Sequence, residues 1–302
     1  MIKFLEHKDI DKTKWDACIE NAKNSLIYAN SWYLNIVSPN WSALIEDNYQ
    51  SVFPLTWRKK YNIHYLFQPF FTQQLGIFSL NDIPNSLVED FINAIPKKFY
   101  FIDINLNYSN HTSLFKLISK TNLILECNSS NEISHNIYSE NTRRNIKKAN
   151  RNNLTISKNT SVDTLINLFK LNKGVELKHI NNKAYKTLKI LLELMLEKNI
   201  AEIHSVYNTL GVIIASVYFI KTNKRDIFFF SALTEQGKET GAMFYIIDEY
   251  IKHITSTSVI FDFEGSNDIN LARFYKSFGA QEQNYYHLKI NNLPPILRKF
   301  KT

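Results

Sequence analysis

Two carboxylates, Asp262 and Glu264, stand one residue apart at the end of the apolar run 259–264. The β-branched and aromatic composition of this run predicts a β-strand. Because side chains alternate between the two faces of a strand, both carboxylates are expected on one face, opposite Phe261 and Phe263. A carboxylate at a strand end can take a proton from a nucleophile, and Glu264 is the better candidate because it lies nearer the end. In the alternative interpretation, Asp262 only makes a structural hydrogen bond to the next loop.

A second chemically distinctive feature is the cationic segment 139–151. Its basic residues recur at spacings of three and four, which predicts a helix with one strongly basic face: Arg143, Arg144, Lys147, Lys148 and Arg151. Such a face could contact the phosphates of tRNA, of a lipid-linked substrate or of a cofactor. It could also be a solvated helix face and nothing more.

The elements that position these residues form an alternation of strands and helices. The runs 201–207, 211–220 and 227–233 predict an antiparallel meander, followed by a helix from residue 240 of about four turns. A strand at 259–263, a helix at 269–278 capped by Asn267 and Asp268, and a strand at 285–290 complete the pattern. This order indicates a mixed sheet with helices packed on it.

The first half of the chain repeats this order more weakly. Strands are expected at 41–46, 50–57, 63–67 and 100–105, with a helix at 86–95, and the segments 112–119 and 123–127 complete the order. Aligning Asp103 with Asp262 gives an offset of 262 − 103 = 159 residues, about one domain length. We therefore predict two domains, residues 1–135 and 136–302. Helices at 139–151, 162–173 and 183–198 and a strand at 154–157 are expected to open the second domain.

The composition is that of a folded chain of two domains, with 302 residues, 44% hydrophobic residues and a formal net charge of +8. Cys18 and Cys127 lie far apart and fit neither a disulfide framework nor a metal pair, which favours the cytoplasm. The start of the chain lacks the pattern of a secretory signal, and no apolar run reaches the length of a membrane span. The histidines show no ligand spacing, so no metal site is predicted.

Three stretches carry a resemblance to known acyltransferases. The sequence YKSFGA at 275–280 resembles the end of the last helix in the GNAT superfamily, except that Ala280 replaces the usual Phe. Asp268 stands where that superfamily often has Asn. With YSENTRRNIKKA at 138–149 and FDFEGS at 261–266, the chain resembles the Fem-type peptidoglycan-bridge aminoacyltransferases and related bacterial acyltransferase domains.

This resemblance implies an α/β (α+β) fold of two tandem GNAT-like domains, of which the first is degenerate. It implies an N-acyltransferase or aminoacyltransferase that moves an acyl group from acyl-coenzyme A or aminoacyl-tRNA to an amine by direct attack. The amine would belong to a small molecule or a cell-wall precursor. Tyr275 would protonate the leaving group, or it would be a core residue. The run QQLGIF at 73–78 extends the resemblance and makes Gln73 and Gln74 candidate substrate-binding residues.

The donor site is expected in the segment EQGKETGA at 235–242, which joins a strand to a helix. In coenzyme A users of the GNAT superfamily the corresponding segment holds the pyrophosphate at a helix N-terminus. Its candidates here are Gln236, Gly237, Gly241 and Ala242, although Glu239 would repel a phosphate. An aminoacyl-tRNA or another acyl carrier therefore stays open. So does a non-catalytic module that binds nucleic acid or an anionic glycoconjugate. The basic tail 294–301 could touch the inner face of a membrane, although a frayed terminus is the favoured interpretation.

Overall fold

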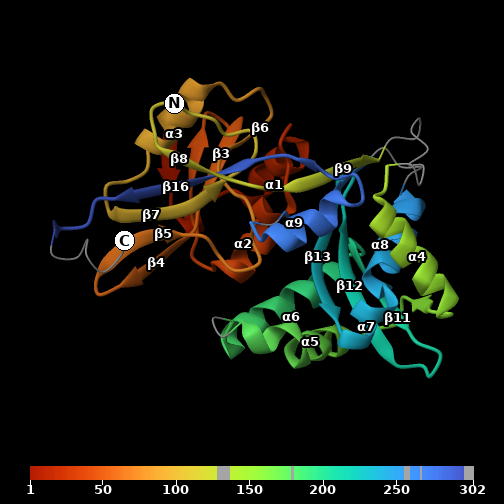
Figure 1. Cartoon of the computed structure of the whole chain (residues 1–302). Helices are drawn as coiled ribbons and strands as arrows, with labels where there is room; N and C mark the ends of the chain where they lie inside the picture. Colours follow the sequence, from red (N-terminus) through yellow and green to blue (C-terminus); the bar gives the residue numbers. More distant parts are fainter. Residues whose placement is uncertain (128–136, 178–179, 255–258, 266, 296–302) are drawn as a thin grey trace. The chain divides into compact units, whose positions relative to one another are not determined.

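The computed structural model describes residues 1–127, 137–177, 180–254, 259–265 and 267–295. Ser266 and most of the tail at 294–301, both named above, lie outside these residues. The chain divides into two compact units (Figure 1). Unit 1 consists of Met1–Lys120 and Asn284–Thr302, and unit 2 consists of Thr121–Gln283. Among the described residues, no helix is long and apolar enough to cross a membrane.

Unit 1 contains two sheets with helices packed on them. Its strands are β1 (Ile2–Leu5), β2 (Ser42–Glu46), β3 (Ser51–Leu55), β4 (Trp57–Lys60), β5 (Ile63–Phe67), β6 (Phe78–Ser79), β7 (Phe99–Leu106), β8 (Leu117–Lys120) and β16 (Tyr285–Asn291). Its helices are α1 (Lys12–Asn21), α2 (Ser31–Val37) and α3 (Asn85–Asn93). The sheet orders are β1-β2-β3-β6 and β4-β5-β7-β16-β8. The apolar face of α3 packs with Ile102 and Ile104 of β7 in one buried core.

Unit 2 contains one sheet of order β10-β11-β12-β13-β14-β9-β15. Its strands are β9 (Leu123–Cys127), β10 (Thr155–Ser157), β11 (Ala201–Tyr207), β12 (Ile213–Lys221), β13 (Arg225–Leu233), β14 (Val259–Asp262) and β15 (Gln281–Glu282). Its helices are α4 (Glu140–Arg151), α5 (Val162–Leu171), α6 (Asn182–Glu197), α7 (Glu235–Thr240), α8 (Ala242–Ile254) and α9 (Ile269–Lys276).

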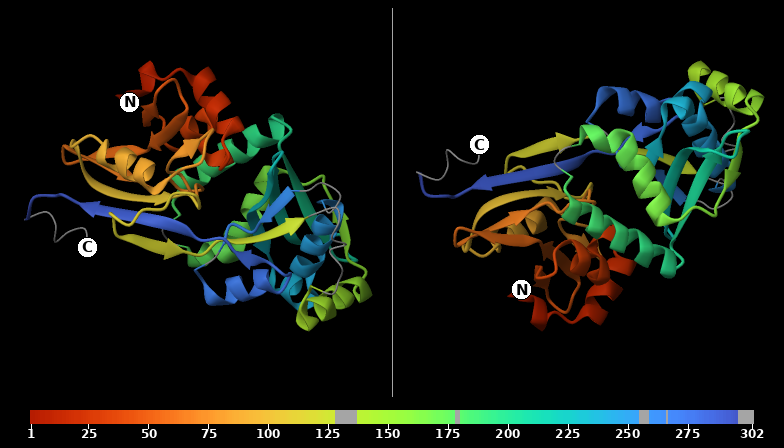
Figure 2. Two further views of the ribbon diagram at one scale, coloured as in Figure 1. Left: turned by 90° about the horizontal axis from the view of Figure 1, so that it is seen from above. Right: turned by 90° about the horizontal axis from the view of Figure 1, so that it is seen from below.

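Helices cover both faces of the unit 2 sheet (Figures 1 and 2). Two neighbouring residues of β12 show the division, because successive side chains of a strand point to opposite faces. The Tyr218 hydroxyl donates a hydrogen bond to the carbonyl of Leu192 on α6, at 2.6 Å. The Phe219 ring stacks on Tyr250 of α8, with 3.7 Å between ring centroids. Helices α5 and α6 therefore cover one face, and α8 covers the other.

Most predicted elements of the second half are confirmed to within a few residues. β11, β12 and β13 form the predicted antiparallel meander, and α8, β14 and α9 follow in the predicted order. The Asp268 side chain caps α9 by accepting hydrogen bonds from the amides of Asn270 and Leu271. One element differs: the segment expected as a loop before α8 folds into the six-residue helix α7.

Two strands do not join the sheet that their position in the sequence suggests; each pairs within the sheet of the other unit. β9, which precedes α4, pairs with β14 and β15 in unit 2. β16, which follows all of unit 2 in the chain, pairs with β7 and β8 in unit 1 (Figure 2). The change of unit consequently falls after Lys120 and after Gln283, rather than at the predicted 135/136 position. The segment expected to complete the first-half order, 112–119, contains strand β8 and no helix.

Both units contain a parallel strand pair joined through a helix. In unit 1 β5 and β7 align Phe67 with Asp103, and in unit 2 β13 and β14 align Ile227 with Asp262. The aligned residues are 103 − 67 = 36 and 262 − 227 = 35 positions apart, so the two units share this pair with nearly the same spacing between its strands.

Candidate functional site

The central feature of unit 2 is a parallel strand pair in which β14 ends at Asp262 while its partner β13 continues. β13 pairs with β14 over only three positions, Arg225 to Ile227, although β13 continues to Leu233. On its other edge β13 pairs with β12, and a bulge there leaves Phe229 without a register partner between Phe228 and Phe230. A bulge re-aims a strand and is common beside functional sites. Within the described residues, the β14-side edge of β13 from Phe228 onward has no strand partner.

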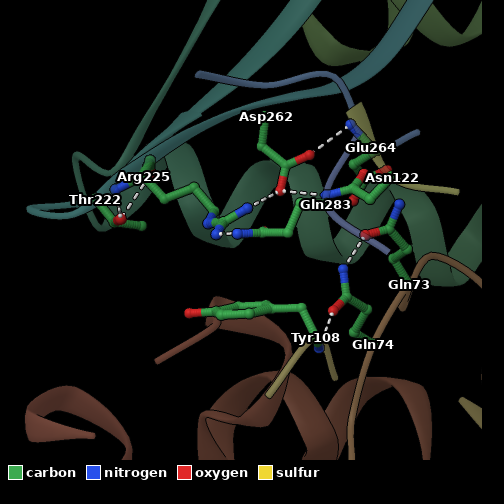
Figure 3. A network of polar contacts seen from close by, with 9 residues as sticks. All are labelled: Gln73, Gln74, Tyr108, Asn122, Thr222, Arg225, Asp262, Glu264 and Gln283. Atoms are coloured by element: carbon green, nitrogen blue, oxygen red, sulfur yellow. Dashed lines mark hydrogen bonds and ion pairs between the residues drawn. The ribbon is translucent and has the colours of Figure 1, made fainter. Parts of the chain in front are cut away.

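Asp262, at the last position of β14, is the centre of a buried polar network (Figure 3). It forms an ion pair with Arg225, and the two residues are 1% and 4% exposed. The Asn122 side-chain amide donates to the same carboxylate at 3.2 Å, and the backbone amide of Glu264 donates to it at 2.8 Å. Arg225 also donates to the Gln283 side chain at 3.0 Å. This is the structural alternative for Asp262, in which its carboxylate holds the next loop.

The other carboxylate, Glu264, leaves the strand. β14 ends at Asp262, and the Glu264 backbone has a left-handed φ of 55°, so strand alternation does not extend to this residue. The predicted common face for the two carboxylates is therefore wrong, because the chain turns after Phe263. The next residue, Gly265, also has a positive φ, and an added Cβ there would lie 2.3 Å from the Thr121 carbonyl oxygen. The close approach of these backbones requires glycine.

Tyr275 on α9 lies in the aromatic core beside Glu264. Its ring stacks on Phe263, with 4.8 Å between centroids, and lies 5.9 Å from Phe228. Burial raises the pKa of the Tyr275 hydroxyl, and the negative charge of Glu264 raises it further. The tyrosine therefore stays protonated and neutral at physiological pH. Among the described residues no hydrogen bond is formed by this hydroxyl, although the residue is only 5% exposed.

The predicted donor segment is occupied by intramolecular contacts. The Gly237 amide donates to the Thr234 hydroxyl that caps α7, at 3.0 Å, and the Gly241 amide donates to the Lys238 carbonyl. The Gln236 side chain accepts a hydrogen bond from Asn208 at 3.0 Å. Ala242 is buried as the first residue of α8. A phosphate-binding loop would need free backbone amides at these two glycines, but both amides already donate hydrogen bonds within the protein.

Both glycines are also explained by close packing. A Cβ at Gly237 would lie 2.2 Å from the Ile214 carbonyl oxygen of β12. A Cβ at Gly241, where φ is 79°, would lie 2.7 Å from the Asn145 carbonyl oxygen of α4. Helix α4 therefore rests directly on the junction of α7 and α8.

The basic helix α4 is anchored to the end of α9. The Thr142 hydroxyl lies 2.7 Å from the Ser277 hydroxyl, and the Ser139 amide donates to the Ser277 carbonyl at 2.9 Å. The Tyr138 ring packs edge-on against Phe278, at 5.4 Å. Residues of the first and last resembling motifs thus meet in unit 2, and these contacts hold α4 against the core.

The predicted basic face of α4 is present. Helix α4 buries Thr142, Ile146 and Ala149, and its cations are exposed except for the half-buried Arg143. Arg144 donates to the Asn141 side chain at 3.0 Å. Within the described part of the chain, no carboxylate forms an ion pair with Lys147, Lys148 or Arg151.

Gln73 and Gln74 belong to unit 1. The Gln74 side chain is fully buried, and it donates to the Gln73 side chain at 2.6 Å and accepts from the Tyr108 amide at 3.0 Å (Figure 3). The Gln73 carbonyl accepts from the Asn105 side chain. Gln74 therefore has a structural role in fixing the chain after β7.

Three polar residues of the Asp262 network were not predicted: Arg225, Asn122 and Gln283. Arg225 lies between the predicted strands 211–220 and 227–233, yet it is the first residue of β13, and only Thr222–Lys224 connect β12 to β13. A signal was available, because Arg225 and Asp226 stand directly before a long apolar run. A buried cation at a strand start requires a buried anion nearby. No comparable sequence signal marks Asn122 or Gln283.

Comparison with known proteins defines the fold class as tandem GNAT-like. The sequence matches no protein-family model and no curated protein. Among solved structures, the crystal structure of FemX matches with a TM-score of 0.66 at 11% identity, over 99% of this chain and 100% of that one. A tandem GNAT protein from the clavulanic acid biosynthesis pathway matches at 0.55 and 7% identity, over 97% and 99%. L-PGS from Bacillus licheniformis matches at 0.51 and 11%, over 96% and 95%.

A metal site and a cysteine nucleophile would each require particular side chains among the described residues. No cluster of three or more His, Cys, Asp or Glu side chains suited to a metal ion occurs there. Both cysteines are buried, and burial raises the pKa of the Cys18 thiol to about 11 and that of Cys127 to about 12. Neither thiol is therefore suited to act as a nucleophile.

Proposed function

We propose that this protein is an N-acyltransferase or aminoacyltransferase that transfers an acyl group from a carrier to an amine, without a covalent enzyme intermediate. The observation that carries the proposal is the end of β14 at Asp262, which within the described residues leaves the following edge of β13 without a strand partner, beside Glu264 and Tyr275. The unpaired edge of β13 offers backbone N–H and C=O groups to an extended acyl-carrier arm, as a sheet edge does to an added strand. The tandem GNAT-like fold supports this class of reaction.

In this proposal Glu264 is the general base. A lysine-like amine has a pKa of about 10.4 and must lose a proton before it can attack the acyl carbon. Glu264 takes that proton, directly or through water. Its left-handed backbone turns it out of β14, and the Asp262 carboxylate holds its amide in that turn.

Tyr275 is the proposed general acid. The amine nitrogen forms a bond to the acyl carbon, the carbon–sulfur or carbon–oxygen bond of the carrier breaks, and the leaving thiolate or alkoxide takes a proton from Tyr275. The hydroxyl is protonated at neutral pH, and its raised pKa means that it gives up the proton only as negative charge develops on the leaving atom.

The carrier is acyl-coenzyme A or aminoacyl-tRNA, and the acceptor is a small amine or a cell-wall precursor reached from the cytoplasm. Gln236, Gly237, Gly241 and Ala242, which lie in α7 and at its junction with α8, remain the proposed contacts for a donor. Arg143, Arg144, Lys147 and Lys148 are proposed to contact phosphate groups, and Gln73 to contact the acceptor.

A second candidate function follows from one observation: the Gly237 and Gly241 amides are already bonded within the fold. A protein that kept the fold but lost the donor site would bind nucleic acid or an anionic glycoconjugate without catalysis.

The test measures amide formation with radiolabelled acyl donors, acetyl-coenzyme A and aminoacyl-tRNA, and a panel of amines. Glu264→Gln and Tyr275→Phe should each lower turnover about 100-fold or more. Glu197→Gln, at the exposed last residue of α6, and Tyr100→Phe, at an exposed tyrosine, are the matched controls and should retain activity.

Donor binding separates the two candidates without needing the right acceptor. A donor at 100 times its Kd should stabilise the fold by about 2.7 kcal/mol, which a thermal shift detects. Equal stabilisation by charged and uncharged tRNA, with no transfer to any amine, would favour the non-catalytic module. Unchanged turnover in both site variants would remove the assignment of Glu264 and Tyr275.

A further inference from the structure

The hairpin between β11 and β12 holds an apolar side chain out in solvent. At its tip Leu210 is 84% exposed, and Val212 is 53% exposed. The Asn208 carboxamide oxygen accepts hydrogen bonds from the amides of both residues, at 3.0 and 2.9 Å. The Asn208 side chain also donates to Gln236 of α7. The tip is therefore a preformed turn fastened to α7, and the exposure of Leu210 is built into it.

The basic helix α4 adjoins this hairpin. Four residues after its last residue, Arg151, strand β10 begins at Thr155, which is the register partner of Tyr207 at the base of the hairpin. Helix α7, to which the hairpin is bonded, ends at Gly241 against α4. Figure 1 shows α4, α7 and the hairpin gathered at one end of unit 2.

The charge of this end of unit 2 comes from α4. Helix α7 contributes Lys238, which pairs with Glu235, and the exposed Glu239, so it adds no positive charge. Helix α4 presents four exposed cations and the exposed carboxylate of Glu140 at its first position. We define the α4–hairpin surface as Arg144, Lys147, Lys148, Arg151, Leu210 and Val212.

We propose that the α4–hairpin surface docks on an anionic lipid bilayer. Cations of α4 would contact the headgroup phosphates, and Leu210 and Val212 would enter the apolar boundary beneath them. Peripheral proteins bind membranes by this combination of buried apolar area and attraction to anionic lipid. The proposal names a lipid source for the phosphate contacts of α4 and does not depend on the acyl-transfer chemistry.

The hairpin distinguishes a bilayer from RNA as the partner. Proteins bind single-stranded RNA through cations combined with aromatic rings on which bases stack. The hairpin tip at 208–212 offers a leucine and a valine, and it contains no aromatic residue. An apolar side chain held in water by a rigid turn has no partner in a phosphate backbone, whereas a bilayer supplies one.

The experiment measures sedimentation of the full chain with vesicles of phosphatidylcholine alone or of equimolar phosphatidylcholine and phosphatidylglycerol. Binding is expected only to the anionic vesicles and should weaken with added salt. The double variant Lys147→Ala/Lys148→Ala should reduce partitioning roughly 25-fold, or about fivefold for each cation. Its matched control is Lys183→Ala/Lys186→Ala, which removes the same charge from exposed positions of α6.

The apolar part of the proposal has its own variant pair. Leu210→Ser should reduce partitioning several-fold, because the apolar contribution scales with buried area. Leu171→Ser, at the 78% exposed end of α5, should leave it unchanged. Circular dichroism confirms that each variant is folded. Equal effects of the two leucine variants, equal effects of the two lysine pairs, or binding to a tRNA without binding to anionic vesicles would each overturn the proposal.

Discussion

Arg225 at the start of β13 and Asp262 at the end of β14 form an ion pair across these neighbouring parallel strands. Asp262 in turn fixes the Glu264 amide, so the ion pair supports the turn that carries the proposed general base. Four polar side chains share the network, which leaves each charge compensated in the core. The stability of unit 2 should therefore depend on the Arg225 cation.

Removing the cation should destabilise unit 2 strongly. Arg225→Leu leaves the Asp262 charge buried without its counter-ion, which should lower the free energy of unfolding by about 3–5 kcal/mol. Lys23→Ala is the control, because it breaks the exposed ion pair with Asp82 and should cost at most about 1 kcal/mol. Urea titration followed by circular dichroism measures both, because the four tryptophans lie in unit 1 and their fluorescence does not report on unit 2. Similar losses in the two variants would mean that the Arg225–Asp262 pair is solvated in solution.

A methyl group at Gly237 should be poorly tolerated even without any donor. The added Cβ would meet the Ile214 carbonyl oxygen at 2.2 Å, so α7 must move away from β12. Overpacking of this kind costs about 1–3 kcal/mol, and a backbone neighbour cannot move as a side chain can. The neighbouring exposed variant Glu239→Ala should change stability by less than about 0.5 kcal/mol. A Gly237→Ala protein of normal thermal stability would show that this glycine is kept for another reason.

Both thiols should be unreactive in the folded protein. Burial raises the pKa of Cys18 to about 11 and that of Cys127 to about 12. Both values lie well above pH 8, so little thiolate exists at that pH, whereas an ordinary thiol has a pKa of about 8.5. Iodoacetamide followed by mass spectrometry should find slow labelling in buffer and two labels in urea. Rapid labelling of the native chain at either position would contradict the burial of that thiol.

Stability should decline at alkaline pH. Burial raises the pKa of Tyr138, Tyr218, Tyr250 and Tyr275 above the ordinary tyrosine value. The unfolded chain therefore loses these protons first, and the stabilisation is complete below about pH 10 and is lost as the pH rises further. Unfolding free energies measured across this range should fall with pH. In Tyr275→Phe the slope should be shallower, because one ionising group is removed; an unchanged slope would argue against a raised Tyr275 pKa.

The sequence predicts local structure well wherever the spacing of apolar residues matches the period of a helix or strand and turn residues mark the ends of the element. The apolar positions of α8 recur with helical spacing, and the runs of β11 to β13 are bounded by turn residues, so these elements were predicted within a few residues. Both units also contain a parallel strand pair with nearly the same spacing between its strands, as a repeated fold requires. The basic face of α4 required only a periodicity argument.

Pairing partners and backbone turns were harder to predict. The composition of β16 indicates a strand but not its sheet, since any edge with a compatible face can accept an apolar strand. Glu264 seemed to continue β14, and nothing in its side chain announces a positive φ. The glycines of the donor segment matched a phosphate-binding pattern, whereas contacts with Ile214 and Asn145 explain them in the fold. Such close approaches depend on residues far away in the sequence.

The placement of β16 has a consequence for synthesis of the chain. Unit 2 possesses every strand of its sheet once Gln283 has been translated, while the position between β7 and β8 in unit 1 stays empty until Tyr285–Asn291 has emerged. The part of the chain made first therefore completes its fold last. A chain truncated after Gln283 and released from the ribosome should hold a finished unit 2 and an open sheet in unit 1.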